Sequence, residues 1–186
     1  MSTCFTVLRQ IGSIRRSVPR SVLQTLVSSL VLSRLDYGNA TLAGIPQYLL
    51  CRIQPVMNSA ARLIFFESRY CHITPLLRRL HWLKAQERID FKLAVLVYKS
   101  FNGSDHSTSS MNSLVSLDNS AHRRLCSASS SMLDVRRTDC STVGDQLLSV
   151  TGPRVWNTLL LHVVSAPTLR LFRNRLKTHL ISSSFP

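Results

Sequence analysis

Apolar residues recur every three or four positions in several stretches of this chain, and polar, proline- or glycine-containing breaks separate these stretches. Spacing of this kind places apolar side chains on one face of an α-helix. The pattern therefore predicts a mainly α protein. The predicted helices cover residues 19–35, 47–66, 85–101 and 168–181, with a shorter helix from an N-cap at Thr74 to about Leu80 and helical structure within 143–161.

Prolines refine the bounds of these predicted helices. Pro19 suits the first turn of its helix, where a missing N–H is tolerated. Pro55 removes a hydrogen bond inside its helix, so this helix either kinks there or begins near Ile53. The pair Gly152-Pro153 predicts a break within residues 143–161.

The composition changes after residue 102. Residues 103–120 are polar and rich in serine and cannot pack a core, so we interpret them as a linker. The predicted organisation is a helical domain over 1–102, this linker, and a C-terminal segment over 121–186. A short β-hairpin is expected within 121–142.

The last predicted helix is amphipathic and too short to be stable alone in water, so its apolar face must be buried. We expect that face to pack on residues 155–161, with Trp156 as the large partner. Both Trp156 and Trp82 are interpreted as core residues in preference to base-stacking platforms. The apolar face of the helix consists of Leu169, Phe172, Leu176 and Leu180.

The charge of the chain is strongly positive, with 23 Lys+Arg against 9 Asp+Glu and a formal net charge of +14. Nineteen of the basic residues are arginines, whose guanidinium groups bind phosphate in a bidentate manner. The first 102 residues carry +10 of this charge. The balance indicates a polyanionic partner, namely the backbone of RNA or DNA. The apolar stretch 147–164 is broken by Pro153-Arg154, so we expect no membrane partner.

Basic side chains on the predicted helices are the candidate binding residues. On a helical wheel Arg88, Lys92 and Lys99 fall within about 40° of one another, on the side opposite the apolar residues. Such a row suits contacts to successive phosphates, and an ordinary solvated helix face is the alternative. The candidate nucleic-acid-binding residues are Arg52, Arg62, Arg78, Arg79, Lys84, Arg88, Lys92 and Lys99.

The sequence offers no catalytic or metal-binding motif. The nine acidic residues are scattered, whereas phosphoryl-transfer chemistry with two metal ions needs clustered carboxylates. The five cysteines form no Cys-x-x-Cys pair, which argues against zinc and favours a reducing, intracellular compartment, cytoplasmic or nuclear. We therefore expect no catalytic residues, no metal ligands and no cofactor. Asp36 is expected to cap a helix end or to pair with Arg34.

Six motifs occur in a fixed order between about residue 5 and residue 181. They are SRLDYGNA with LAGIP over 33–46, NSAARLI over 58–64, HITPLL over 72–77, LHWL over 80–83, RIDFK over 88–92 and GPRVWN over 152–157. Together they resemble the region that follows the catalytic palm in LINE-type, jockey-like non-LTR retrotransposon reverse transcriptases. The chain departs from this family at its serine-rich stretch, where the family usually has a Pro-rich segment, and at residues 157–160, where the family usually has proline.

The resemblance implies a thumb-like helical bundle that grips a template–primer duplex, followed by a small helical C-terminal part. It also implies that the parent enzyme copies RNA into DNA at a nicked target with Mg²⁺ held in a palm upstream of this region, so that Met1 is an accidental start. Three interpretations stay open: a template–primer or RNA-binding module, the translated remnant of a decayed element with no selected function, and a module that docks on other retrotransposon protein segments.

We predict that the chain has no polymerase activity at any Mg²⁺ or Mn²⁺ concentration, because it lacks a carboxylate cluster to hold the ions. Primer extension on an RNA template measures this directly. Extension that survives rigorous purification and disappears in the Asp36→Ala variant would contradict the prediction.

Overall fold

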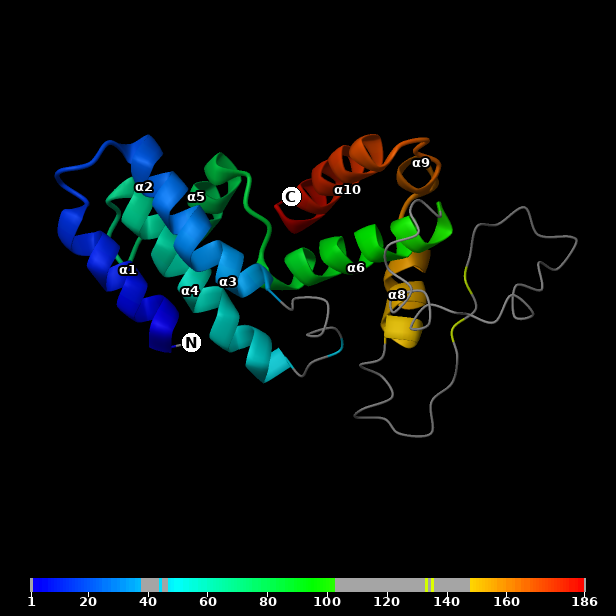
Figure 1. The fold of residues 1–186 in the computed structure, drawn as a ribbon, viewed down its shortest axis with the longest axis horizontal. Helices are drawn as coiled ribbons and strands as arrows, with labels where there is room; N and C mark the ends of the chain where they lie inside the picture. The colour runs from blue at the N-terminus through cyan, green and yellow to red at the C-terminus, as the bar shows by residue number, and fades with distance from the viewer. Residues whose placement is uncertain are drawn as a thin grey trace, which may run out of the picture. The chain divides into compact units, whose positions relative to one another are not determined.

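The computed structural model describes residues 2–37, 44, 47–102, 133, 135 and 148–185. In these residues all regular secondary structure is helical, which confirms the predicted mainly α fold (Figure 1). The predicted linker and the predicted hairpin lie outside the described residues, apart from Leu133 and Val135, which belong to no helix or strand.

The chain forms two compact units. Among the described residues, the first unit holds 2–37, 47–88 and 180–185, and the second holds 44 and 89–179. The division therefore runs through a helix at residues 88 and 89, whereas the sequence suggests a boundary after residue 102. The division into a domain over 1–102 and a C-terminal segment over 121–186 stays a prediction.

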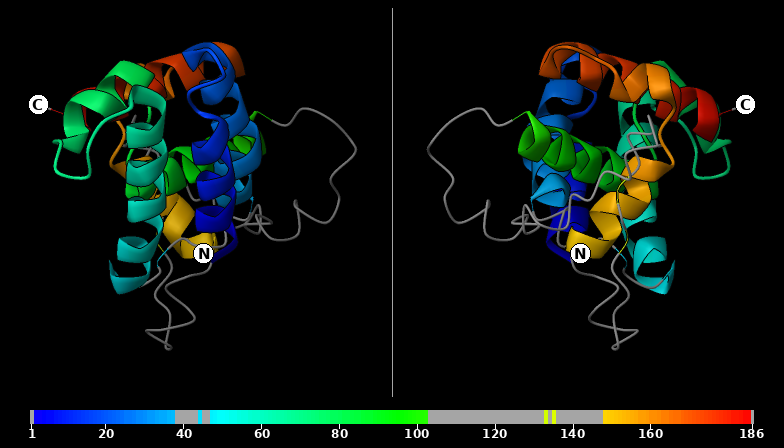
Figure 2. Two further views of the ribbon diagram at one scale, coloured as in Figure 1. Left: turned by 90° about the vertical axis from the view of Figure 1, so that its left-hand side faces the viewer. Right: turned by 90° about the vertical axis from the view of Figure 1, so that its right-hand side faces the viewer.

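The first unit contains α1 (Ser2–Ile14), α2 (Arg20–Val27), a π-helical turn η1 (Ser28–Leu32), α3 (Ser33–Asp36), α4 (Gln47–Phe65) and α5 (Ile73–Leu80). Helix α1 has no counterpart among the predicted elements. α4 packs against α1, α2 and α5, and Figure 2 shows α1 and α4 running alongside each other. This arrangement is a helical bundle in which α4 packs against three other helices.

The core of this bundle is a stripe along α4. Val56, Met57, Ala60, Ala61 and Ile64 are completely buried, at the helical spacing that the sequence shows. The small alanines allow neighbouring helices to approach closely. α1 and α4 are indeed close, because a Cβ atom added at Gly12 would lie 3.4 Å from the Cδ1 atom of Leu63.

Helix α4 continues through Pro55, so of the two alternatives a start near Ile53 is wrong. Pro55 and Cys51 are both exposed. The carbonyl that loses its helical hydrogen bond therefore belongs to the solvent side of the helix, where water can replace the missing N–H.

Three other predicted bounds need correction. Residue Pro19 is the extended N-cap of α2 and not its first helical residue, and the predicted helix 19–35 is interrupted by the π-helical turn. α5 begins at Ile73 with His72 as its N-cap, so Thr74 is not the cap. Pro75 fits this earlier start because the first N–H groups of any helix have no intrahelical partner.

The second unit contains α8 (Leu148–Asn157) and α9 (Leu161–Val164). It also contains α6 (Ala85–Phe101) from residue 89 onward and α10 (Leu169–Ser184) up to residue 179. The predicted break at Gly152-Pro153 is wrong, since α8 runs through it. Val150, Pro153 and Trp156 are all buried at three-residue spacing. Burial of this face outweighs the single hydrogen bond that the proline removes.

A chain of four aromatic rings forms the core of the second unit. The Tyr98 ring stacks on that of Phe172 with ring centroids 4.3 Å apart. The ring centroids of Phe172 and Trp156 are 6.0 Å apart, and those of Trp156 and Phe101 are 5.3 Å apart. The Tyr98 hydroxyl donates a 2.7 Å hydrogen bond to the Ala166 carbonyl, so this buried polar group is satisfied.

The expected packing of the final helix on Trp156 is confirmed. Phe172 and Leu176 are completely buried, while Leu169 and Leu180 are half-buried. Trp82 and Trp156 are 7% and 6% exposed, so both are core residues as predicted.

We predict that Phe172→Ala lowers the free energy of unfolding by about 3–5 kcal/mol, because it removes a fully buried ring and leaves a cavity among Tyr98 and Trp156. Chemical denaturation measures the change. Phe5→Ala is the control, since Phe5 on α1 is 41% exposed and its loss should cost far less. Equal effects of the two substitutions would contradict this description of the core.

Candidate nucleic-acid interface

The structure separates the eight predicted binding residues into two groups. Five of them are exposed and available to a ligand, namely Arg52 on α4, Arg78 and Arg79 on α5, and Lys92 and Lys99 on α6. The other three, Arg62, Lys84 and Arg88, are partly buried and make contacts within the protein.

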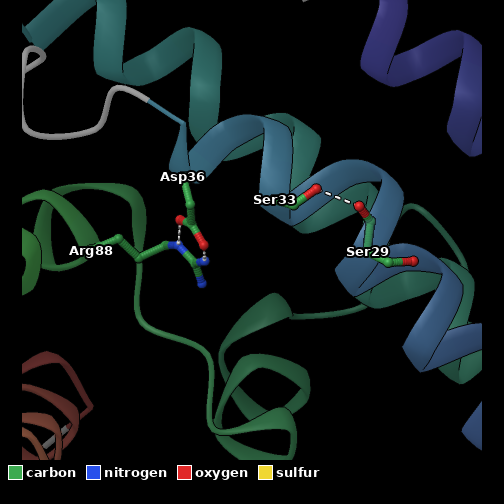
Figure 3. A network of polar contacts seen from close by, with 4 residues as sticks. All are labelled: Ser29, Ser33, Asp36 and Arg88. Carbon is green, nitrogen blue, oxygen red and sulfur yellow. Dashed lines mark hydrogen bonds and ion pairs between the residues drawn. The ribbon is translucent and has the colours of Figure 1, made fainter.

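Arg88 forms a bidentate ion pair with Asp36 (Figure 3). Its Nε lies 3.0 Å from Asp36 Oδ1 and its Nη2 lies 2.5 Å from Oδ2, and its side chain is only 17% exposed. Asp36 is the last residue of α3, and Arg88 lies in the first turn of α6. The sequence suggests Arg34 or a helix cap for Asp36. The structure gives it this partner 52 positions further along the chain.

Lys84 and Arg62 also have contacts within the protein. Lys84 Nζ donates a 2.9 Å hydrogen bond to the Ser184 carbonyl at the end of α10 and lies 5.1 Å from the centroid of the buried Phe185 ring. Arg62 Nη2 donates a 3.1 Å hydrogen bond to the Cys71 carbonyl. A cation near the C-terminal end of a helix is favourable, so Lys84 has a structural explanation.

The predicted row on α6 is therefore not uniform. Lys92 and Lys99 are exposed as the helical wheel suggests, but the guanidinium of Arg88 is held by a carboxylate. A phosphate would have to compete with Asp36 for Arg88. We expect any phosphate contacts of this row to come from the two lysines.

The end of α4 carries an unusual backbone conformation. Phe66 has φ 61°, which is left-handed. Its N–H bonds to the Leu63 carbonyl, and the N–H of Glu67 bonds to the Arg62 carbonyl at 3.0 Å. These two bonds define a Schellman motif, in which the left-handed position is usually glycine. A residue with a side chain costs about 1–2 kcal/mol in this conformation. Phe66 is 49% exposed, so full burial of its ring does not offset that cost.

Arginine side chains from three segments surround this helix end. The Arg20 guanidinium lies over the Phe65 ring, 3.7 Å from its centroid, and the Arg79 guanidinium lies over the same ring at 5.0 Å. Arg15 lies over the Phe66 ring at 5.8 Å. We call these five residues the α4-end cluster. All of them belong to the first unit.

The α4-end cluster is a basic and aromatic surface. A guanidinium that lies over a ring can direct the N–H groups around its edge outward, so it can still donate to phosphate oxygens. Arg20 and Arg79 are exposed, and Phe65 and Arg15 are half-buried. The arrangement therefore combines charged donors with an accessible ring, the two components that nucleic-acid-binding surfaces use.

Of the α4-end cluster, the sequence analysis identified only Arg79. It missed Arg15, Arg20, Phe65 and Phe66 because they come from separate segments that only the folded bundle brings together. One signal was available: α4 ends without a nearby glycine, at two consecutive phenylalanines. A bulky residue where glycine is usual indicates a special position.

Among the described residues, no group of three or more His, Cys, Asp or Glu side chains could hold a metal ion. Among the same residues, no helix combines the length and the apolar character needed to cross a membrane. Cys4, Cys51 and Cys71 are free thiols.

Comparisons with known proteins identify no relative: no protein-family model matches the chain, and neither a curated protein nor a solved structure matches it significantly.

We predict that the Arg88–Asp36 pair contributes a coupling energy of about 1 kcal/mol to folding, because the geometry is bidentate and Arg88 is largely buried. A double-mutant cycle with Arg88→Ala and Asp36→Ala, followed by chemical denaturation, measures it. Lys92→Ala on the same helix is the control and should change stability by less than about 0.5 kcal/mol. Additive effects of the two substitutions would show that the pair contributes nothing.

Proposed function

We propose that this chain is a nucleic-acid-binding helical module related to the thumb and post-thumb region of LINE-type reverse transcriptases, and that it binds the phosphate backbone of RNA or DNA. The single observation that carries the binding proposal is the α4-end cluster, where Arg15, Arg20 and Arg79 come together on an exposed aromatic surface. Binding to the backbone requires no base-specific geometry.

The placement of the six motifs supports the family part of this proposal. Several of their apolar residues are buried, namely Ala60 and Ala61 of the second motif, Leu77 of the third and Trp82 of the fourth. The ion pair between Asp36 and Arg88 joins the first motif to the fifth. These buried residues and this ion pair support the proposal that the motifs reflect a shared architecture.

The charge distribution supports the binding part. Arg62, Lys84 and Arg88 are partly buried and contact other residues of the protein. In contrast, the contacts described above for Arg20 and Arg79 are with an aromatic ring. Glu67 follows Phe66 and is the acidic residue next to the cluster in the chain. A net positive surface of this kind attracts polyanions through released counterions.

We predict that Arg20→Ala and Arg79→Ala each reduce the slope of log K against log salt concentration by about 0.7–0.9, the contribution of one phosphate contact. Fluorescence anisotropy of a labelled oligonucleotide, titrated at several salt concentrations, measures the slope. Arg170→Ala is the control: it removes the same charge from an exposed site on α10 in the other unit.

A slope that falls equally in all three variants would indicate only a net-charge effect and would remove the α4-end cluster from the interface. Absence of any salt-dependent binding by the unmodified chain would contradict the proposed function itself.

A further inference from the structure

Phe66 is the residue of the α4-end cluster whose side chain the packing of the bundle does not explain. Its φ of 61° is a conformation that glycine adopts without strain, and the Schellman motif uses only its backbone N–H, which donates to the Leu63 carbonyl. Its side chain is 49% exposed, so the ring is not a core residue. Strained residues of this kind occur preferentially at functional sites.

We propose that the Phe66 ring is a stacking platform for an unpaired base, so that the α4-end cluster binds single-stranded RNA or DNA in preference to duplex. This inference rests on the proposed function and deepens it, because it assigns the class of nucleic acid. The arginines hold the phosphates, and the ring accepts the base that follows.

The geometry around the ring agrees with this assignment. Arg15 lies 5.8 Å from the Phe66 centroid, farther than the 3.7 Å between Arg20 and the Phe65 centroid, so Phe66 is the less tightly covered ring. Phe65 is half-buried and covered by two arginines. Phe66 is consequently the ring that a base can reach.

The preference for single strands follows from the accessibility of bases. Each base has a flat face that stacks on an aromatic side chain regardless of sequence, and such a contact strengthens binding by about 5- to 140-fold per base. In a duplex the same faces are already stacked on neighbouring base pairs, and exposing one requires unstacking. A duplex would therefore bind the cluster through its phosphates alone.

The backbone strain at Phe66 allows a test in which the variant protein is more stable than the original. Phe66→Gly relieves the left-handed conformation and should raise the melting temperature by about 2–8 °C. It should also weaken binding of an oligothymidine of about 15 nucleotides by at least about fivefold, and it should leave binding of a blunt-ended duplex of two annealed strands unchanged. Anisotropy titrations of the full chain at one salt concentration measure both affinities.

Two further variants isolate the ring from the backbone. Phe66→Leu keeps the strained backbone and an apolar side chain but removes the ring, so it should lose the same single-strand affinity. His81→Gly relieves the same left-handed strain, with φ 53°, at the exposed residue after α5. It should raise the melting temperature without changing either affinity.

The outcomes separate this inference from the proposed function. If the unmodified chain binds neither oligonucleotide, the proposed function fails and the inference fails with it. If the unmodified chain binds oligothymidine and duplex with equal affinity, the stacking platform is wrong while backbone binding stands. The same conclusion follows if Phe66→Gly leaves the two affinities unchanged, or if it weakens them to the same extent.

Discussion

Burial of one face of α4 is the constraint on which the rest of the first unit depends. Five completely buried residues along this helix, from Val56 to Ile64, can be shielded from water only if other helices pack around it. α1, α2 and α5 do so. Because α4 is fixed in this way, its C-terminal end is fixed as well, and the residues that meet there come from segments far apart in the sequence. The surface proposed to bind nucleic acid therefore forms only because packing of the core fixes the end of α4.

The same architecture divides the basic residues into two kinds. Arg88 and Lys84 contact Asp36 and the end of α10, where their charges stabilise contacts between segments that are 52 and 100 positions apart. Arg20 and Arg79 instead lie over the Phe65 ring and stay exposed. The net charge of +14 therefore overstates the number of cations that a ligand could meet, and the arrangement of arginines around aromatic rings is the more specific indication of binding.

The sequence predicted the long helices well because their apolar periodicity is local: the bounds of α6 agree with the predicted 85–101, and the packing of Phe172 near Trp156 is as expected. It predicted the effects of proline poorly, since Pro153 is accommodated by tertiary burial that no local rule contains. It also could not pair Asp36 with Arg88 or assemble the α4-end cluster, because these contacts depend on how the bundle folds. The left-handed position of Phe66 was equally hidden, since a helix end without glycine gives only a weak signal.

The central claim is that the end of α4 contacts nucleic acid. The most direct measurement is ultraviolet cross-linking of the chain to oligothymidine, followed by trypsin digestion and mass spectrometry. Trypsin cleaves after Arg62 and Arg69, so Phe65 and Phe66 fall together in the peptide of residues 63–69. Our account predicts that this peptide carries the nucleotide adduct and loses it in the Phe66→Gly variant. Adducts confined to peptides from α6, α8 or α10 would contradict it.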